Sequence, residues 1–395
     1  MNIAVFFEQQ LKSGGGFQQS LSVVELLSKY NRKKYNFIIY TNHRDNINIL
    51  KKYNIRIKFF KINKIRKLIL LIRRFLILNN IFHFKTLNYI EKQLFCDKID
   101  ICYFLAPSKI PFFLEKLNYV FTVWDLSHRD MPEFPEVRDN FEFEKRELIY
   151  QNLIKKAFAI IADSKVGKNN IMRRYTIDEN RVYVAPFLPS KQTSEMKKNI
   201  DIRKIFQLNY KYIFYPAQFW AHKNHIYILD SLKILNDKYG KRITAVFIGS
   251  DKGNLSYILD YAKRLGIQSQ IHYLGFVREE YYANLFQNSL ALVMPTYFGP
   301  TNIPPLEAFK LEVPVFYSDL PEFRADLGDA VFYFDLKNPK DLAYKLNLLI
   351  NNKLNIDEKI NLGKQHLDKW MDKDYWLILE EIFDNYYIRH KCWKS

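Results

Sequence analysis

The 395-residue chain is poor in cysteine and glycine and has no long apolar run. Its three cysteines, Cys96, Cys102 and Cys392, have neither the spacing of a disulfide framework nor that of metal ligands, which excludes a disulfide scaffold and a zinc finger. No run of 18 apolar residues occurs, so we expect no membrane-spanning helix, and the first residues lack the basic segment and cleavage site of a signal peptide. These absences predict a cytoplasmic protein that lies, at most, on a membrane surface.

Acidic residues are missing from residues 46–90, where eleven lysines and arginines supply much of the net charge of +18. Such a cluster indicates a polyanionic partner: nucleic acid, anionic lipid or a phosphorylated substrate. If residues 64–78 are helical, one face is apolar and both flanks are basic, which is typical of an interfacial helix on anionic lipid. The alternative is a core-packed helix with solvated flanks. The apolar face is Ile65, Leu68, Ile69, Ile72, Phe75 and Leu76, and the flanks are Arg66, Arg73, Lys64, Lys67 and Arg74.

Short apolar runs alternate with helical patterns, which predicts parallel sheets with helices on both faces. The rhythm breaks at residues 186–199, where prolines and polar residues indicate a linker. We therefore predict an α/β protein with two doubly wound, Rossmann-like domains, residues 1–188 and 201–375, joined by a linker at 189–200 and facing each other across a ligand-binding cleft. The expected strands are 3–7, 37–40, 101–105, 120–123, 160–162 and 182–185 in the first domain, and 212–215, 244–248, 270–273, 291–294, 315–317 and 331–334 in the second.

Three of the twelve glycines stand together at Gly14, Gly15 and Gly16, between the first predicted strand and its helix. Backbone amides there can approach an anion without obstruction by a Cβ atom, and the helix N-terminus adds the positive end of its dipole. The loop is not a Walker A motif, because no Gly-Lys-Ser/Thr follows, and not a GxGxxG motif, because residue 19 is glutamine. We interpret Gly15 and Gly16 as a ligand-binding loop; the alternative is a flexible loop.

The second domain has two candidate anion-binding segments. A turn-rich loop joins the strand at 291–294 to a helix predicted to open at Pro304 and Pro305, and the free amides of its first turn suit a phosphate. Glu307 is predicted to lie in that turn, where its carboxylate either stabilises the helix dipole or chelates a diol such as a ribose. His222 and Lys223 follow the strand at 212–215, and a lysine in that place suits phosphate, although alone it would usually be solvated.

Polar residues also follow the predicted strand at 120–123 of the first domain. Asp125 and His128 stand just beyond its carboxyl end. Residues in that position usually face the ligand in this architecture. Asp125 and His128 are therefore candidate catalytic residues. The alternative is that Asp125 caps the next turn and His128 packs locally.

Four stretches together resemble glycosyltransferase family 4, the retaining nucleotide-sugar transferases of the GT-B fold. They are the glycine-rich loop, residues 121–129 (FTVWDLSHR), residues 219–225 (FWAHKNH), and residues 302–309 (NIPPLEAF) with the Val-Pro-Val and Gly-Asp-Ala segments that follow. The last stretch is the most specific, and the likeness spans nearly the whole chain. Residues 274–277 also resemble the family's loop that holds the nucleotide base through backbone contacts.

The resemblance implies a retaining transferase that moves a hexose-type sugar from a UDP or GDP donor to a lipid-linked or surface-glycan acceptor. It implies cell-envelope polysaccharide biosynthesis (lipopolysaccharide, O-antigen or capsule) on the cytoplasmic face of the inner membrane, without a metal or another cofactor, and a final helix at 376–395 that packs back on the first domain. Catalytic roles are implied for Asp125, His128, Lys223 and Glu307, and donor contacts for Gly15, Gly16, His222, Lys223, Gly275, Val277, Thr301, Asn302, Ile303 and Glu307.

The chain departs from the family in its reacting loop. The family's E-x7-E pair keeps only its second member, Glu307, because Gly299 stands at the place of the first, and Thr301 and Asn302 are the candidates to contact sugar hydroxyls instead. The usual Arg-Lys pair reads His222-Lys223. Two other classes stay open: a GT-B sugar-nucleotide 2-epimerase and a non-enzymatic polyanion-binding protein. We expect no nucleic-acid partner, because that would explain the charge but not the loop before Glu307.

Overall fold

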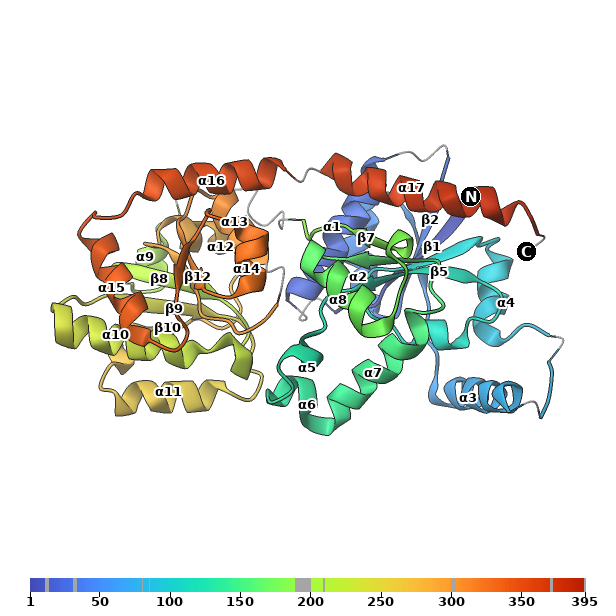
Figure 1. Cartoon of the computed structure of the whole chain (residues 1–395), viewed down its shortest axis with the longest axis horizontal. Helices are drawn as coiled ribbons and strands as arrows, with labels where there is room; N and C mark the ends of the chain where they lie inside the picture. The colour runs from blue at the N-terminus through green and yellow to red at the C-terminus, as the bar shows by residue number, and fades with distance from the viewer. Residues whose placement is uncertain are drawn as a thin grey trace. The chain divides into compact units, whose positions relative to one another are not determined.

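The computed structural model describes residues 1–10, 14–30, 34–79, 81–84, 86–188, 200–208, 210–299, 303–369 and 372–393. It contains two compact α/β units (Figure 1). The first unit combines Met1–Leu126, Phe143–Pro186 and Asp372–Ser395, and the second combines Ser127–Glu142 and Phe187–Met371. Each unit is built around its own parallel sheet.

A seven-stranded sheet forms the first unit, in the order β3-β2-β1-β4-β5-β6-β7, and every paired strand is parallel to its neighbour. Its central strands are buried along almost their whole length because helices cover both faces. The strand order changes direction between β1 and β4, the usual place for a ligand in such sheets. The strands are β1 (Asn2–Phe7), β2 (Asn36–Thr41), β3 (Arg56–Phe59), β4 (Ile101–Phe104), β5 (Asn118–Val123), β6 (Ala159–Ala162) and β7 (Val182–Val184).

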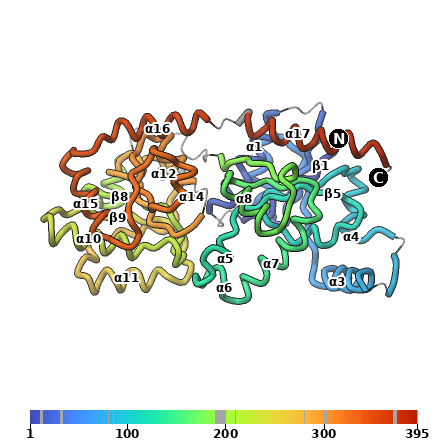
Figure 2. Tube along the Cα trace, in the orientation of Figure 1, coloured from blue at the N-terminus to red at the C-terminus, as the bar shows by residue number. Residues whose placement is uncertain are grey.

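The helices of the first unit connect successive strands and pack on both faces of the sheet. The last helix, α17 (Asp372–His390), returns from the C-terminal end of the chain to lie beside α1 (Figure 2). Aromatic stacking fixes it there, because the Trp376 ring lies on Tyr30 at 5.3 Å between centroids. The remaining helices are α1 (Gly15–Lys29), α2 (Arg44–Leu50), α3 (Lys64–Leu78), α4 (Tyr89–Cys96), α7 (Glu142–Leu153) and α8 (Lys165–Tyr175).

The second unit contains a six-stranded parallel sheet in the order β10-β9-β8-β11-β12-β13. Its order changes direction between β8 and β11. The strands are β8 (Tyr212–Pro216), β9 (Thr244–Ile248), β10 (Ile271–Tyr273), β11 (Leu292–Met294), β12 (Val315–Ser318) and β13 (Phe332–Phe334).

Helices of the second unit also lie on both faces of its sheet: α10 packs with α15, and α13 packs with α16 on the other side (Figure 1). The helices are α5 (Ser127–Asp130), α6 (Pro135–Arg138), α9 (Ile202–Ile205), α10 (His225–Tyr239), α11 (Leu255–Arg264), α12 (Glu279–Gln287), α13 (Ile303–Lys310), α14 (Pro321–Leu327), α15 (Pro339–Ile350) and α16 (Ile356–Asp368).

Three details differ from the sequence-based expectations. Residues 127–142, which we placed in the first domain, group with the second unit, and the final helix begins at Asp372 rather than at residue 376. The predicted linker at 189–200 lies outside the described residues except for Ile200. Edge strand β3 was not expected, because its sequence, Arg-Ile-Lys-Phe, carries two charges. Both charges approach Asp97, with Arg56 at 3.6 Å and Lys58 in a direct ion pair, so they are partnered at the sheet edge.

Candidate functional site

The switch point of the second sheet brings two loops together. His222 lies in the single turn that follows β8, and Tyr297 and Phe298 follow β11, the neighbouring strand. The backbone N–H of Tyr297 donates to the carbonyl of His222 at 3.0 Å. The His222 ring stacks on Phe298 with 3.9 Å between centroids and 15° between planes. The two segments chosen from the sequence are therefore one structural feature.

A third segment reaches the same loops from earlier in the chain. Glu136 of α6 accepts the backbone N–H of His222 at 2.8 Å, and the same carboxylate oxygen bonds the ring nitrogen Nδ1. The two side chains are only 6% and 9% exposed. Burial alone would raise the pKa of Glu136, but the hydrogen bonds from the ring and backbone of His222 outweigh it and hold that pKa below its usual value. Glu136 is therefore an anion, and the sequence analysis did not select it.

Two residues that follow His222, Lys223 and His225, differ in charge. His225 is completely buried and stacks on Phe219 at 4.4 Å, and burial, with the nearby charges of Lys223 and His222, lowers its pKa to about 3. It is therefore neutral at physiological pH and serves as an aromatic core residue. The Lys223 carbonyl accepts the Tyr215 hydroxyl at 2.9 Å, which ties this turn to β8. Lys223 and His222 are the cationic candidates of this edge.

Glu307 occupies a buried position in α13, only 3% exposed. The hydroxyl of Tyr282 donates to its Oε2 at 2.6 Å. Burial and the adjacent carboxylate raise the pKa of Tyr282 well above its usual value, so the phenol keeps its proton. Because α13 begins at Ile303 rather than at Pro304, Glu307 is its fifth residue and lies just beyond the first turn in which we predicted it. Its partner Tyr282 carries no recognisable sequence signal and was missed.

The glycines at the ends of β9 and β10 pack tightly on each other. The N–H of Gly249 donates to the carbonyl of Gly275 at 2.9 Å, and both residues have positive φ. A Cβ atom on Gly249 would lie 2.6 Å from the Ala217 carbonyl oxygen, so only glycine fits there. Val277, half-buried, follows on the same loop. Gly249 was detectable as one of few glycines directly after a predicted strand.

The loop before α13 is described only in part. Gly299 has φ 104°, which favours glycine, and Ile303 is the buried first residue of the helix. Thr301 and Asn302, which we predicted to contact the donor, lie outside the described residues. Among the residues that the structure describes, no three His, Cys, Asp or Glu side chains are grouped as metal ligands would be.

The first unit places several predicted residues at the carboxyl edge of its sheet. Gly15 and Gly16 open α1, and a Cβ atom on Gly16 would lie 2.7 Å from the Trp124 ring, so the indole packs directly on this backbone. Asp125 accepts a hydrogen bond from Arg146 at 3.0 Å. His128 is fully buried but belongs to the second unit. The structure thus assigns Asp125 and His128 to different units.

One titratable group at this edge was not anticipated. Glu8 directly follows β1, and Ser108 follows the neighbouring strand β4. Burial raises the pKa of Glu8 from its usual 4.5 to about 7, although a hydrogen bond with Ser108 partly opposes this. The carboxyl group therefore changes charge near neutral pH.

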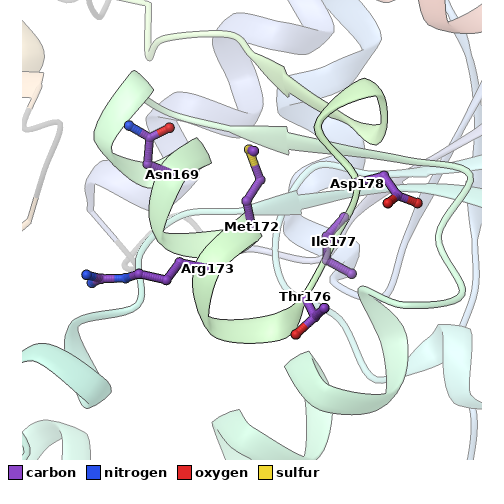
Figure 3. Close-up of a pocket in the computed structure, with 6 residues that line it drawn as sticks. All are labelled: Asn169, Met172, Arg173, Thr176, Ile177 and Asp178. Atoms are coloured by element: carbon purple, nitrogen blue, oxygen red, sulfur yellow. The ribbon is translucent and has the colours of Figure 1, made fainter.

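A shallow pocket of the first unit lies away from these residues. Figure 3 shows its lining of Asn169, Met172, Arg173, Thr176, Ile177 and Asp178. These residues come from the second half of α8 and the turn after it. Since α8 starts at the carboxyl end of β6 and runs back along the sheet, the pocket lies toward the amino edge, and it contains none of the predicted site residues.

Comparison with known proteins bears directly on the second unit. Residues 179–365 match the family model "Glycosyl transferases group 1". This segment is a glycosyltransferase group 1 domain. It contains the predicted site residues His222, Lys223, Gly275 and Glu307.

Relatives and solved structures extend the likeness. The O-antigen chain mannosyltransferase RfbU of Salmonella typhimurium is 24% identical over 191 residues, which span 48% of this chain and 49% of that protein. A glycosyltransferase from Rickettsia africae has a TM-score of 0.70 at 15% identity, covering 97% of this chain and 99% of its own. Anabaena HepE in complex with UDP-glucose has a TM-score of 0.68 at 14% identity, covering 98% and 99%. The chain therefore has the GT-B fold, with its parallel sheets of seven and six strands.

Proposed function

We propose that the protein is a retaining glycosyltransferase of the family 4 type that transfers a hexose-type sugar from a UDP or GDP donor. The acceptor is a lipid-linked or surface glycan of cell-envelope polysaccharide biosynthesis. The observation that carries the proposal is the convergence of His222 and Lys223 with the loop leading to Glu307, at the switch point of the group 1 domain. The similarity to RfbU, an O-antigen chain mannosyltransferase, and to HepE, which binds UDP-glucose, supports a nucleotide-sugar donor and an O-antigen type of product.

The chemistry at this edge is electrostatic. When the sugar leaves the donor, negative charge develops on the diphosphate, and a fixed cation in a partly dry site stabilises that charge strongly. Lys223 supplies this charge together with His222, and the positive end of the α13 dipole adds to it, although Pro304 and Pro305 carry no N–H to donate. Glu307, held by Tyr282, is buried in the same helix and orients the ribose of the donor. Because these groups provide the countercharge, we expect transfer to proceed without a metal ion.

The first unit is the proposed acceptor side. Glu8 and the Gly16 backbone lie at the carboxyl edge of its sheet, near the point where the strand order changes direction. Asp125 is the further candidate for contact with the reacting groups, and Arg146 holds its carboxylate in place. His128 stays a proposed catalytic residue.

We further propose that α3 of the first unit binds an anionic membrane surface. Its only buried residue is Leu70, and five of the six apolar residues that we predicted to share a face are at least half exposed. No helix among the described residues is long and apolar enough to cross a bilayer. The exposed side chains are Ile65, Leu68, Ile69, Ile72 and Phe75, with Leu71 and Leu78 beside them.

The arginines of α3 have a different role from the one that their sequence pattern suggested. Arg73 makes two hydrogen bonds to the carboxylate of Glu115, at 2.8 and 3.0 Å, and Arg66 lies over the Tyr89 ring at 4.0 Å. Arg74 lies over Phe112 at 4.3 Å. These contacts bind the inner side of α3 to the body of the unit, so the apolar side faces outward. Docking would combine apolar insertion with the charge of the exposed lysines on the same segment, Lys61, Lys64 and Lys67.

The proposed donor class is tested with the purified full chain. UDP, GDP and dTDP are titrated, and either UDP or GDP is expected to raise the unfolding temperature. Lys223→Ala should abolish that stabilisation and the transfer activity without changing the circular dichroism spectrum. Wild-type stabilisation and activity in this variant would contradict the assignment of Lys223, and absence of binding by all three nucleotides would contradict the donor class.

A further inference from the structure

We propose that Glu136 is a positioning residue that holds His222 as a charged imidazolium beside Lys223, so that both side chains bind the diphosphate of the donor. This inference rests on the proposed function, because it takes a nucleoside diphosphate as the ligand. It assigns a role to the segment 127–142, which the group 1 match does not include.

The geometry fixes the imidazole on several sides. One oxygen of Glu136 bonds both the backbone N–H and the ring Nδ1 of His222. The carboxylate therefore fixes the orientation of the His222 ring relative to the His222 backbone. One ring face stacks on Phe298, and Phe134, two residues before Glu136, approaches at a steep angle of 84°. The imidazole is therefore set by packing and hydrogen bonding before any ligand arrives, as a phosphate-binding group needs to be.

The charges around the ring explain why a carboxylate is required. Lys223 is the next residue in the chain, and its positive charge disfavours a second cation close by. His225 contributes no charge, because its pKa falls to about 3. Glu136 supplies a buried negative charge in direct contact with the imidazole. An anion at Nδ1 requires a proton there and favours the doubly protonated ring, which lets two cations stand side by side.

This arrangement gives a pH-dependent consequence that a merely structural contact would not give. With Glu136 ionised, His222 keeps its charge through neutral pH, and affinity for a diphosphate varies little. Glu136→Gln preserves the size of the side chain and an acceptor oxygen but removes the charge. His222 should then lose its extra proton as the pH rises past the usual value for histidine, about 6.5.

The binding experiment measures UDP and GDP affinity from pH 6 to pH 8 by calorimetry. The affinity of the wild type should change little over this pH range. The same is expected of Glu133→Gln, a matched control at an exposed glutamate three residues earlier. Glu136→Gln should bind nearly as tightly as wild type at pH 6 and about ten-fold more weakly at pH 8, since one charge-assisted bond to phosphate is lost. Glu136→Asp should restore part of the profile, and the corresponding nucleosides, which lack phosphate, should bind all variants alike. In a His222→Gln background, Glu136→Gln should have no pH-dependent effect.

A second measurement needs neither a ligand nor a variant. Nitrogen-15 NMR of the ligand-free wild-type protein reports the protonation of the His222 ring directly. We expect both ring nitrogens to be protonated at pH 7. A neutral His222 ring at that pH, or a Glu136→Gln variant with the wild-type pH profile, would overturn the inference. If no nucleotide binds the wild-type protein, the proposed function fails, whereas the NMR result still decides the role of Glu136.

Discussion

The hydrogen bond between Tyr282 and Glu307 provides a sharp test of the donor site. Tyr282→Phe removes only the hydroxyl group that donates to Glu307 Oε2 at 2.6 Å, and the aromatic ring can stay in place against Phe214 and Phe286. Because Glu307 is only 3% exposed, water cannot readily replace the lost hydrogen-bond donor. A hydrogen bond to a charged group contributes about 1.5–3 kcal/mol, so we expect unfolding to become easier by roughly that amount.

The magnitude is measurable by calorimetry. For a unit of about 200 residues, 1 kcal/mol corresponds to a shift of about 2–4 °C, so the transition of the second unit should fall by roughly 3–12 °C. The same variant should bind UDP or GDP about ten-fold more weakly, because the carboxylate that we propose to orient the ribose loses its anchor.

A double-mutant cycle separates this bond from general packing. In a Glu307→Gln background the bond joins two neutral groups and contributes about 0.5–1.5 kcal/mol, so Tyr282→Phe should cost about 1–2 kcal/mol less than in the wild type. Equal costs in both backgrounds, or a loss below about 0.5 kcal/mol in the wild type, would refute the view that Tyr282 holds an ionised Glu307.

Two further results are expected. Ile69→Asp, a change on the exposed face of α3, should abolish co-sedimentation with anionic vesicles while UDP and GDP binding stays at the wild-type level; vesicle binding by this variant equal to wild type would show that the apolar face is not the docking surface. The pKa of Glu8 is raised to about 7 in the folded protein. Its favourable contribution to the free energy of unfolding is therefore full below about pH 4.5 and is lost as the pH rises through 7. Unfolding measured at pH 5 and pH 8 should therefore show a smaller loss of stability in Glu8→Gln than in wild type, and an identical loss in both would contradict the burial of this carboxyl.

Much of the fold was predictable because buried parallel strands are continuously apolar. The runs at 3–7, 101–105 and 160–162 correspond to β1, β4 and β6 within one residue at each end. Strand β3 does not meet this criterion, because it is an edge strand that carries the charged residues Arg56 and Lys58. Their partner Asp97 is about forty residues away in the sequence. Local periodicity carries no information about such a distant partner.

The placement of the candidate site residues was predictable where a suitable residue type follows a predicted strand. His222, Lys223 and Glu307 meet that condition, and their elements are where the sequence placed them, except that α13 begins one residue earlier than predicted. Glu136 and Tyr282 do not meet it, because tertiary packing alone brings them to His222 and Glu307.

The outward face of α3 has a similar explanation. The helical periodicity identified its apolar side, but not which side the protein covers. That is decided by contacts of Arg73 with Glu115 and of Arg74 with Phe112, which lie roughly forty residues further along the chain.

The most direct test of the central claim is sugar transfer by the purified full chain. UDP- and GDP-hexoses carrying a carbon-13 label at the anomeric position are incubated with lipid-linked glycan acceptors and saturating EDTA, and the product is analysed by NMR. The account predicts a labelled glycolipid that keeps the anomeric configuration of the donor and forms at an undiminished rate in EDTA. An inverted product, a requirement for added Mg²⁺ or Mn²⁺, or epimerised donor without transfer would contradict it.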